Sequence, residues 1–358
     1  MTDKDLLSFV TAVSGDTYLK VEENLGEGFV RLQVSEAERR QAKHDIRGVE
    51  DIVVELLRNA RDAHAQRILV ATQREGDVRT LTVLDDGVGV PTSLRERIFE
   101  PRVTSKLETM VMDRWGVHGR GMALFSIRSN ALSADIIASA PHRGASVNVT
   151  VDTSSLTERA DQSTWPTIDK NASGSARVAR GPHNIVRNVV EFALEHPEID
   201  LFFGSPTEVL ATVVTLARFE MDEVDLLRCD DLSRLQVWQR PGAAVDAAEL
   251  CDTASDIGLP VSERTAHRIL AGDVVPLRTV AATALKSTVA AVDPRAVDIY
   301  RDRRGLKIDA GDLDAFSGEL ERAFDAIAER YFLHLRTAPK ITVGRDDIRV
   351  RFEVDKED

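Results

Sequence analysis

The stretch Glu55-Leu-Leu-Arg-Asn-Ala-Arg-Asp-Ala63 is followed by Asp85-Asp-Gly-Val-Gly-Val90 and then by Gly116-Val-His-Gly-Arg-Gly-Met-Ala-Leu124. Each motif alone is weak evidence, because acidic helices, Asp-Gly turns and glycine-rich runs are all common. Chance rarely produces all three in this order and at this spacing. Together they predict a pocket for a nucleotide.

The first motif lies on a segment, 49–67, whose apolar residues have helical spacing. On this helix Glu55, Asn59 and Asp62 are four and then three residues apart, so they share one face. Glu55 can act as a general base on a water molecule. Asn59 can offer its amide oxygen to Mg²⁺, a cation that prefers oxygen ligands. The alternative is an ordinary polar stripe on an amphipathic helix.

The second motif follows two predicted strands, 67–72 and 79–84, which a turn at 74–77 connects. A carboxylate at a strand end, such as that of Asp85, can accept a hydrogen bond from the exocyclic amine of adenine. Gly87 and Gly89 let the backbone approach a flat base closely. The alternative is a plain β-turn after a strand.

The third motif places Gly116, Gly119 and Gly121 before a helix that is expected to start near residue 122. Backbone N–H groups at a helix start suit phosphates. Lys106 lies upstream and could supply a cation, and residues 107–118 are expected to form a mobile lid. No Gly-Lys-Ser/Thr follows the glycines, and they do not follow a first βα strand, which excludes a P-loop and a dinucleotide-binding motif.

These motifs closely resemble those of the GHKL ATPases, which include gyrase-type and type IIB topoisomerase subunits, MutL, heat-shock chaperones and sensor histidine kinases. The resemblance covers roughly residues 45–152. It implies that Glu55 activates water, that Asn59 binds Mg²⁺ and that Asp85 binds the adenine amine of ATP. The family usually has Asn after that Asp, where this chain has Asp86.

The resemblance also implies a hydroxyl near the adenine on a late strand, and Ser146 stands at that point in Arg143-Gly-Ala-Ser-Val147. The complete set of residues expected to bind the nucleotide and its metal ion is Asn59, Asp62, Asp85, Gly87, Gly89, Lys106, Gly116, Gly119, Gly121 and Ser146.

The subfamily stays open. The nearest branch is expected to be that of MutL and the topoisomerase VI B subunit, which hydrolyses ATP to drive dimerisation. His44-Asp-Ile-Arg47 is similar to a kinase phosphoacceptor box, but it lies only eleven residues before Glu55. Ile98-Phe-Glu-Pro101 is also kinase-like, whereas Thr104-Ser-Lys106 suits MutL as well.

Length and composition set further bounds. A chain of 358 residues with 43% hydrophobic residues predicts two domains with real cores. No apolar run approaches the roughly 18 residues of a membrane span, and no signal peptide is evident, so a cytoplasmic protein without a membrane partner is expected. Cys229 and Cys251 indicate neither a disulfide framework nor a zinc site. The net charge of −13 argues against broad, nonspecific coating of nucleic acid.

The expected fold class is α/β (α+β): a two-layer GHKL sandwich followed by a mainly helical C-terminal domain with a terminal β-hairpin. We expect an N-terminal segment that could strap onto a second subunit, the ATP-binding domain, a Ser/Thr-rich linker and the helical domain, at 1–44, 45–152, 153–181 and 182–358. The helices and strands expected after the linker are 183–196, 199–203, 206–218, 247–257, 262–271, 313–331, 340–343 and 348–354.

Residues 247–272 resemble a helix-turn-helix, which would expose Glu263, Arg264, His267 and Arg268, although a packed αα-hairpin is the favoured interpretation. DNA binding through 254–272 is therefore one hypothesis. The resemblance to the topoisomerase and MutL branch implies a lysine of a second domain that reaches the γ-phosphate, and Lys340 and Lys286 are the candidates for it.

The expected function is Mg²⁺-dependent ATP binding with slow hydrolysis, used as a conformational or dimerisation switch in a homodimer. A DNA transaction and a separate partner subunit are further expectations. The alternatives are a soluble histidine-kinase-like protein kinase and a nucleotide-sensing scaffold without turnover.

Overall fold

The computed structural model describes residues 21–105, 111–113, 116–118, 121–170, 176–221, 231–290, 310–331, 333–343 and 348–356. The chain divides into two compact units, 1–288 and 289–358. Each unit is described by itself.

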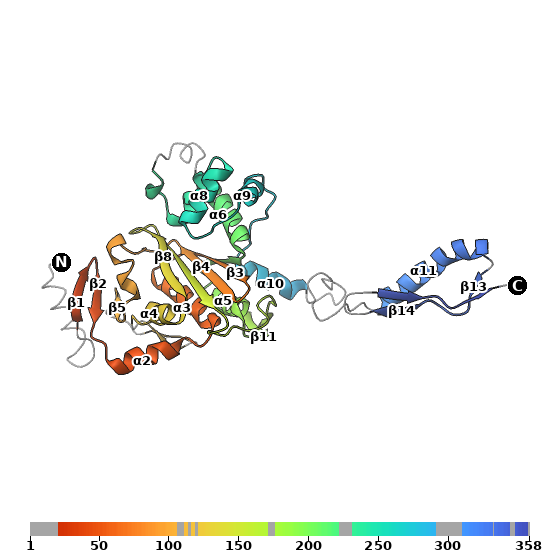
Figure 1. Ribbon diagram of the computed structural model, residues 1–358, viewed down its shortest axis with the longest axis horizontal. Coiled ribbons are helices and arrows are strands. Elements are labelled where there is room, and N and C mark those ends of the chain that lie inside the picture. The colour runs from red at the N-terminus through yellow and green to blue at the C-terminus, as the bar shows by residue number, and fades with distance from the viewer. Residues whose placement is uncertain are drawn as a thin grey trace. The chain divides into compact units, whose positions relative to one another are not determined.

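The first unit is built on a five-stranded sheet in the order β12-β3-β4-β9-β8 (Figure 1). Its neighbouring strands are antiparallel, except that β12 runs parallel to β3. The bounds of the strands are β3 Arg67–Glu75, β4 Val78–Asp85, β8 Ser133–Ser139, β9 Ala145–Asp152 and β12 Asp200–Gly204.

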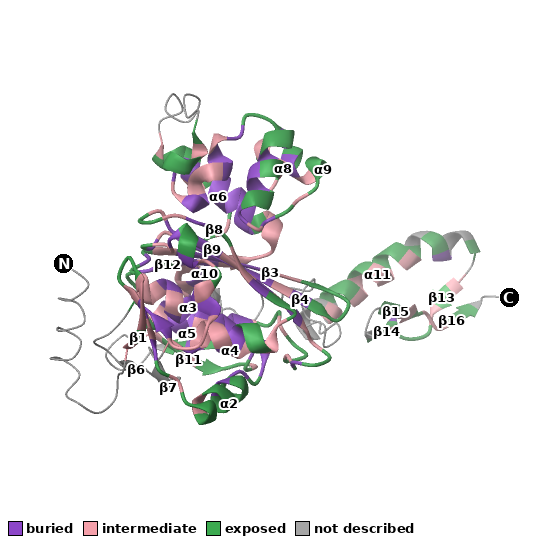
Figure 2. Ribbon diagram, turned by 60° about the vertical axis from the view of Figure 1, so that its left-hand side comes forward, coloured by how far each residue is buried: buried purple, intermediate pink, exposed green. Residues whose placement is uncertain are grey.

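The inner face of the sheet is covered by helices α3, α4 and α5, which are Val49–Asp62, Ala123–Asn130 and Ile185–Glu195. Alternate strand residues such as Ile68, Leu81 and Val149 point into this core and are fully buried. Apolar residues at helical spacing let α3 bury one face completely, as Figure 2 shows by its burial colouring. A helix before it, α2, spans Glu36–Asp45 and begins with a Ser35–Glu38 capping box.

The outer face of the sheet is covered by a second layer of helices (Figure 1). Leu69, Ala71 and Leu84 point into this second core, because they alternate with the residues of the inner face. The layer consists of α6 Pro206–Glu220, the 3₁₀ helix η4 Val237–Ala243, α8 Ala247–Asp256 and α9 Glu263–Leu270. The guanidinium of Arg67 lies 4.4 Å from the ring centroid of Trp238 and so joins β3 to η4.

The predicted fold class is confirmed: the protein is a mixed α/β structure with a sandwich and an added helical region. Its divisions differ from the expected ones. Residues 185–204 complete the inner core and the sheet rather than start a second domain. Residues 153–181 contain a short hairpin, β10 Thr167–Lys170 with β11 Ala176–Arg180, between parts of the same unit.

Smaller elements frame the sandwich. A three-stranded sheet joins β1 Val21–Gly26, β2 Phe29–Leu32 and β5 Val103–Thr104. The other short elements of this unit are η1 Thr92–Leu94, η2 Arg97–Phe99, β6 Val111–Asp113, β7 Gly116–His118, η3 Leu232–Arg234 and α10 Val280–Ala290. Residues 1–20 of the expected N-terminal segment lie outside the described residues.

The second unit has a long helix, α11 Ala310–Tyr331, and two antiparallel strand pairs. One pair joins β13 Leu333–Leu335 to β16 Val354–Lys356. The other joins β14 Lys340–Val343 to β15 Ile348–Arg351 and is the predicted terminal hairpin. Within the described part of the chain, no helix is long and apolar enough to cross a membrane.

Candidate functional site

A cavity of about 1100 Å³ lies in the first unit beside α3. One wall is the polar face of α3. The other walls include the turn at 88–90, the segment 103–105 and the start of α4 at 121–124. This volume is slightly above the roughly 300–1,000 Å³ that is typical of small-molecule and cofactor sites.

The three polar residues predicted on α3 all line the cavity: Glu55, Asn59 and Asp62. Glu55 accepts a hydrogen bond of 2.5 Å from the Nη1 atom of Arg58, whose side chain is 4% exposed. Asp62 accepts two hydrogen bonds from the guanidinium of Arg61, at 3.1 and 2.9 Å. Both carboxylates are therefore oriented by arginines of the same helix.

Asn59 differs from its two neighbours on this face. Its Nδ2 atom is buried and has no hydrogen-bond partner within the described residues. A buried amide without a partner is costly, so this side chain has bonding capacity left for a ligand of the cavity. In the described part of the chain, no cluster of three or more His, Cys, Asp or Glu side chains is arranged to hold a metal ion.

Asp85 ends β4 and is 6% exposed. Its Oδ1 atom accepts a hydrogen bond of 2.9 Å from the backbone N–H of Gly87. Burial raises the pKa of this carboxyl to about 7; the backbone bond from Gly87 lowers the pKa and the nearby charge of Asp86 raises it. Val88 and Gly89, which follow Asp85 in the same turn, line the cavity, whereas Asp85 is not among the lining residues.

The turn that follows Asp85 is held against a second turn, 140–144. Gly89 has a φ of +67°, and a Cβ atom there would lie 2.1 Å from the carbonyl oxygen of Ala140. The backbone N–H of Gly144 donates to the carbonyl of Gly87 at 2.9 Å. This contact between two backbones requires glycine at residue 89.

Of the remaining glycines of the third motif, Gly121 lines the cavity at the start of α4, and its carbonyl accepts a hydrogen bond from Arg102 N–H at 2.8 Å. Gly116 lies in β7, where it pairs with Asp113 of β6. Lys106 and Gly119 lie outside the described residues. Half of the lid expected at 107–118, namely residues 107–110, 114 and 115, also lies outside them.

Ser146 does not join the other predicted residues. It is fully buried, and its hydroxyl donates to the carbonyl of Ile257 at 2.7 Å. Side chains alternate along a strand, and Val147 and Val149 of β9 face the inner core. Ser146 therefore faces the outer helical layer, on the side of the sheet opposite to α3.

Asp86 has a role that the sequence analysis did not assign. Its Oδ1 atom accepts hydrogen bonds from the backbone N–H groups of Gln66 and Arg67, at 2.8 and 2.9 Å. Asp86 thus fixes the start of β3 beside the turn after β4. A carboxylate and an Asn amide oxygen can both accept such bonds.

The sequence analysis also missed residues 157–159, which line the cavity from the segment expected to be a linker. The carbonyl of Thr157 accepts a hydrogen bond of 3.1 Å from Val49 N–H at the start of α3. The carboxylate of Glu158 is 2% exposed and binds Arg79 at 2.8 Å and Arg74 at 2.5 Å. Polar composition predicted a linker here, although buried ion pairs use the same residue types.

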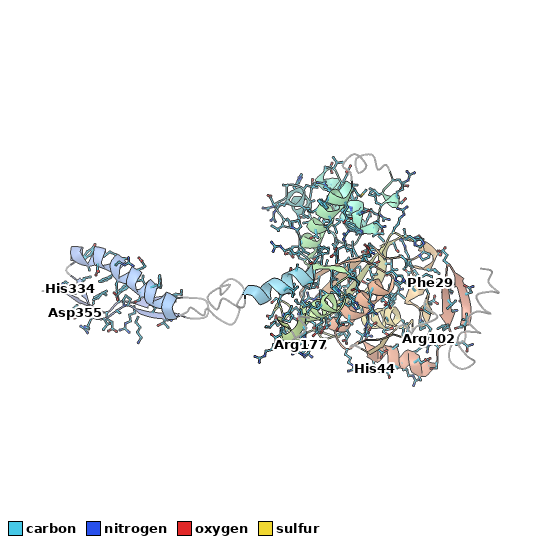
Figure 3. All side chains as sticks on the ribbon, turned by 180° about the vertical axis from the view of Figure 1, so that it is seen from behind. Phe29, His44, Arg102, Arg177, His334 and Asp355 are labelled. Atoms are coloured by element: carbon cyan, nitrogen blue, oxygen red, sulfur yellow. The ribbon has the colours of Figure 1, made fainter. Side chains whose placement is uncertain are left out.

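His44 lies on α2, which ends at Asp45, and not on the helix that carries Glu55 (Figure 3). It is exposed and is not among the residues that line the cavity. In the outer layer, Glu263, Arg264, His267 and Arg268 are placed on α9, as expected for either a helix-turn-helix or a packed hairpin. Lys340 belongs to the second unit, and the side chain of Lys286 lies outside the described residues.

Comparison with known proteins agrees with this arrangement. Residues 44–155 match the family of histidine kinase-, DNA gyrase B- and HSP90-like ATPases. The predicted resemblance is confirmed, and this part of the chain is a GHKL-type domain.

The relatives that match are DNA mismatch repair proteins MutL. The protein from Thermus thermophilus is 41% identical over 83 residues, which is 23% of this chain and 15% of the relative. The protein from Lactiplantibacillus plantarum is 35% identical over 86 residues, 24% of this chain and 12% of the relative. The matched part of this chain thus spans no more than 15% of the length of these relatives.

Proposed function

We propose that the protein binds ATP with Mg²⁺ in the cavity beside α3 and hydrolyses it slowly. The observation that carries this proposal is the placement of Glu55, Asn59 and Asp62 on one wall of a cavity that the turn at 88–90 and the start of α4 also line. The family match of residues 44–155 supports the nucleotide.

The residues fit a magnesium ion that a nucleotide helps to hold. Mg²⁺ is usually bound by one or two protein oxygens together with phosphates and waters. The side chain of Asn59 lines the cavity, and its amide oxygen could be such a ligand, while its unpaired Nδ2 atom could donate to a phosphate oxygen. When bound, the ion neutralises charge on the phosphates. We assign Asn59 as its protein ligand, with Asp62 placed one turn further along the same face.

We assign Glu55 as the general base. Its carboxylate lines the cavity and is held by Arg58, which is itself almost fully buried. In hydrolysis of ATP the protein mainly positions the water and stabilises charge. A carboxylate with a fixed orientation can accept a proton from a water that is placed between it and the terminal phosphate.

The adenine and the phosphates are assigned to opposite ends of this arrangement. Asp85 and the turn with Gly87 and Gly89 would recognise the adenine. The backbone at Gly119 and Gly121, with Lys106, would bind the phosphates, because N–H groups at the start of α4 suit anions. Gly116 would support this loop, whereas Ser146 has no place in the proposed site.

The turnover would serve as a conformational or dimerisation switch. The MutL relatives are named as DNA mismatch repair proteins, which supports a role in a DNA transaction, through the α8–α9 region at 254–272 and with a partner subunit. A homodimer is proposed from the resemblance to the GHKL branch in which ATP hydrolysis drives dimerisation.

Hydrolysis is tested with γ-labelled ATP, by counting free phosphate and protein-bound label in wild type, Glu55→Ala and His44→Ala. We expect free phosphate from wild type, at least about 100-fold less from Glu55→Ala, as for loss of a general base, and no label on the protein. Label that is retained on wild type and lost in His44→Ala would instead identify a kinase. ATP binding without either product would identify a nucleotide-sensing scaffold.

A further inference from the structure

Three arginines lie outside the nucleotide cavity on elements that hydrogen bonds hold together. Arg95 follows η1, Arg143 lies in the turn between β8 and β9, and Arg240 lies in η4. The guanidinium of Arg95 donates to the carbonyl of Ser139, at the end of β8. The carbonyl of Arg143 accepts a hydrogen bond of 2.8 Å from Val237 N–H, three residues before Arg240 on a 3₁₀ helix.

These arginines keep unused hydrogen-bonding capacity although they are half-buried. The Nε atoms of Arg95 and Arg240 are buried and have no hydrogen-bond partner within the described residues. Neither Arg143 nor Arg240 forms a side-chain hydrogen bond or an ion pair within 4.0 Å with any residue that the structure describes. Buried guanidinium groups in proteins are normally paired.

The electrostatics of the cluster are unfavourable without a ligand. Burial lowers the pKa of Arg240, and the positive charges of Arg95 and Arg143 lower it further. Asp256 and Asp231 act in the opposite direction. Asp231 also forms an ion pair with Arg234 at 3.7 Å and interacts electrostatically with Arg143, so several arginines share this counter-ion.

We propose that Arg95, Arg143 and Arg240 form a binding site for a phosphate group that is not part of the nucleotide in the cavity. Guanidinium forks match the planar pairs of oxygens that a phosphate presents. A bound dianion would offset the mutual repulsion and satisfy the unpaired donors. None of the three arginines lines the nucleotide cavity, so the two sites are distinct.

The phosphate could belong to a nucleic-acid backbone or be a free anion. The same helical layer carries Arg264, His267 and Arg268 on α9. The turn with Arg143 also contacts the nucleotide-site turn, through the bond from Gly144 N–H to the carbonyl of Gly87. An anion on the cluster would therefore hold the backbone that supports the proposed adenine site.

The test uses the full chain, with Arg143→Gln/Arg240→Gln compared with Arg39→Gln/Arg40→Gln. The control removes the same charge from exposed residues of α2. Binding of a short labelled duplex DNA is followed by fluorescence anisotropy over a range of salt. Stabilisation by inorganic phosphate, relative to chloride at equal ionic strength, is followed by thermal unfolding with a saturating non-hydrolysable ATP analogue present.

If the source is nucleic acid, the cluster variant should bind DNA at least about tenfold more weakly than wild type. The slope of its log affinity against log salt concentration should fall in magnitude by about two, while the affinity and slope of the control should change little. If the source is a free anion, phosphate stabilises wild type and the control but not the cluster variant, and DNA binding is equal in all three. The proposal is overturned if wild type and the cluster variant respond alike to both ligands.

A loss of fold is separated from a loss of the site by two further observations. Because the repulsion among the arginines and their attraction to Asp231 and Asp256 act in opposite directions, the cluster variant should unfold at a temperature close to that of wild type when no phosphate is present. The variant Arg143→Lys/Arg240→Lys keeps the positive charges but loses the two-pronged guanidinium geometry. Its affinity for DNA or for phosphate should therefore lie between those of wild type and the Gln variant.

Discussion

Asp85 is a carboxyl group whose pKa is raised by burial to about 7, from an ordinary value of 3.8. Between these two values the folded protein holds a proton that the unfolded chain has lost. The free energy of unfolding should therefore fall as pH rises from about 4 to about 7, by up to about 4 kcal/mol, since one pKa unit corresponds to about 1.4 kcal/mol.

Asp85→Asn should remove this part of the pH dependence, because the amide does not titrate. Denaturant unfolding of both proteins without nucleotide, at several pH values, measures the difference. Asp135→Asn is the control, since Asp135 is a residue of β8 with 44% side-chain exposure. Equal slopes for wild type and Asp85→Asn would contradict the assigned pKa.

Gly89 is required by its surroundings as well as by its φ of +67°. Gly76 has a similar φ of +59°, but a Cβ atom there would meet nothing within 4 Å. Gly76→Ala should cost roughly 1–2 kcal/mol, the cost of a left-handed residue. Gly89→Ala should cost clearly more and weaken ATP binding as well, which denaturant unfolding and titration calorimetry would detect. Equal costs would show that the two turns can separate.

At the scale of elements, the segment 153–168 connects the sheet to α3, through the ion pair of Glu158 with Arg79 and the hydrogen bond of Thr157 with Val49. Glu158→Ala would leave Arg79 of β4, 9% exposed, without its carboxylate partner. Breaking a buried ion pair costs about 3–5 kcal/mol, whereas an exposed pair contributes about 0–1 kcal/mol. Glu96→Ala, which removes an exposed pair with Arg128, is the matched control. Similar unfolding midpoints for the two variants would contradict a stabilising role of this buried ion pair.

Local patterns predicted most of the elements. Apolar residues at helical spacing predicted α3, although it ends at Asp62 and not at 67. The predicted helices at 206–218, 247–257 and 262–271 correspond to α6, α8 and α9 within a few residues. Such elements depend on contacts within one segment of the chain. The sequence indicates these contacts through the spacing of apolar residues and through capping residues.

The errors arise where distant segments meet. The strand predicted at 199–203 is β12, but its parallel pairing with β3 joins parts of the chain that were assigned to different domains. Ser146 was placed by its motif alone. The alternation of Val147, Val149 and Val151 on the inner face was the signal that would have placed Ser146 on the other face.

At the scale of the whole molecule, every residue that lines the cavity belongs to the first unit. Residues 1–288 should therefore bind ATP with an affinity within about twofold of the full chain. Titration calorimetry of the two proteins measures this. A much weaker affinity of the shorter protein would show that the second unit contributes to the site, and Lys340→Ala in the full chain would then test that lysine.

The central claim is that the cavity binds ATP together with Mg²⁺ through Asn59. The most direct measurement is the Kd for ATP, with Mg²⁺ and with EDTA, of wild type, Asn59→Ala and the control Asn130→Ala, which lies outside the cavity lining. We predict that Mg²⁺ tightens binding about tenfold or more in wild type and Asn130→Ala, and much less in Asn59→Ala, as expected for loss of a metal ligand. Absence of ATP binding, or an equal effect of Mg²⁺ in all three proteins, would contradict it.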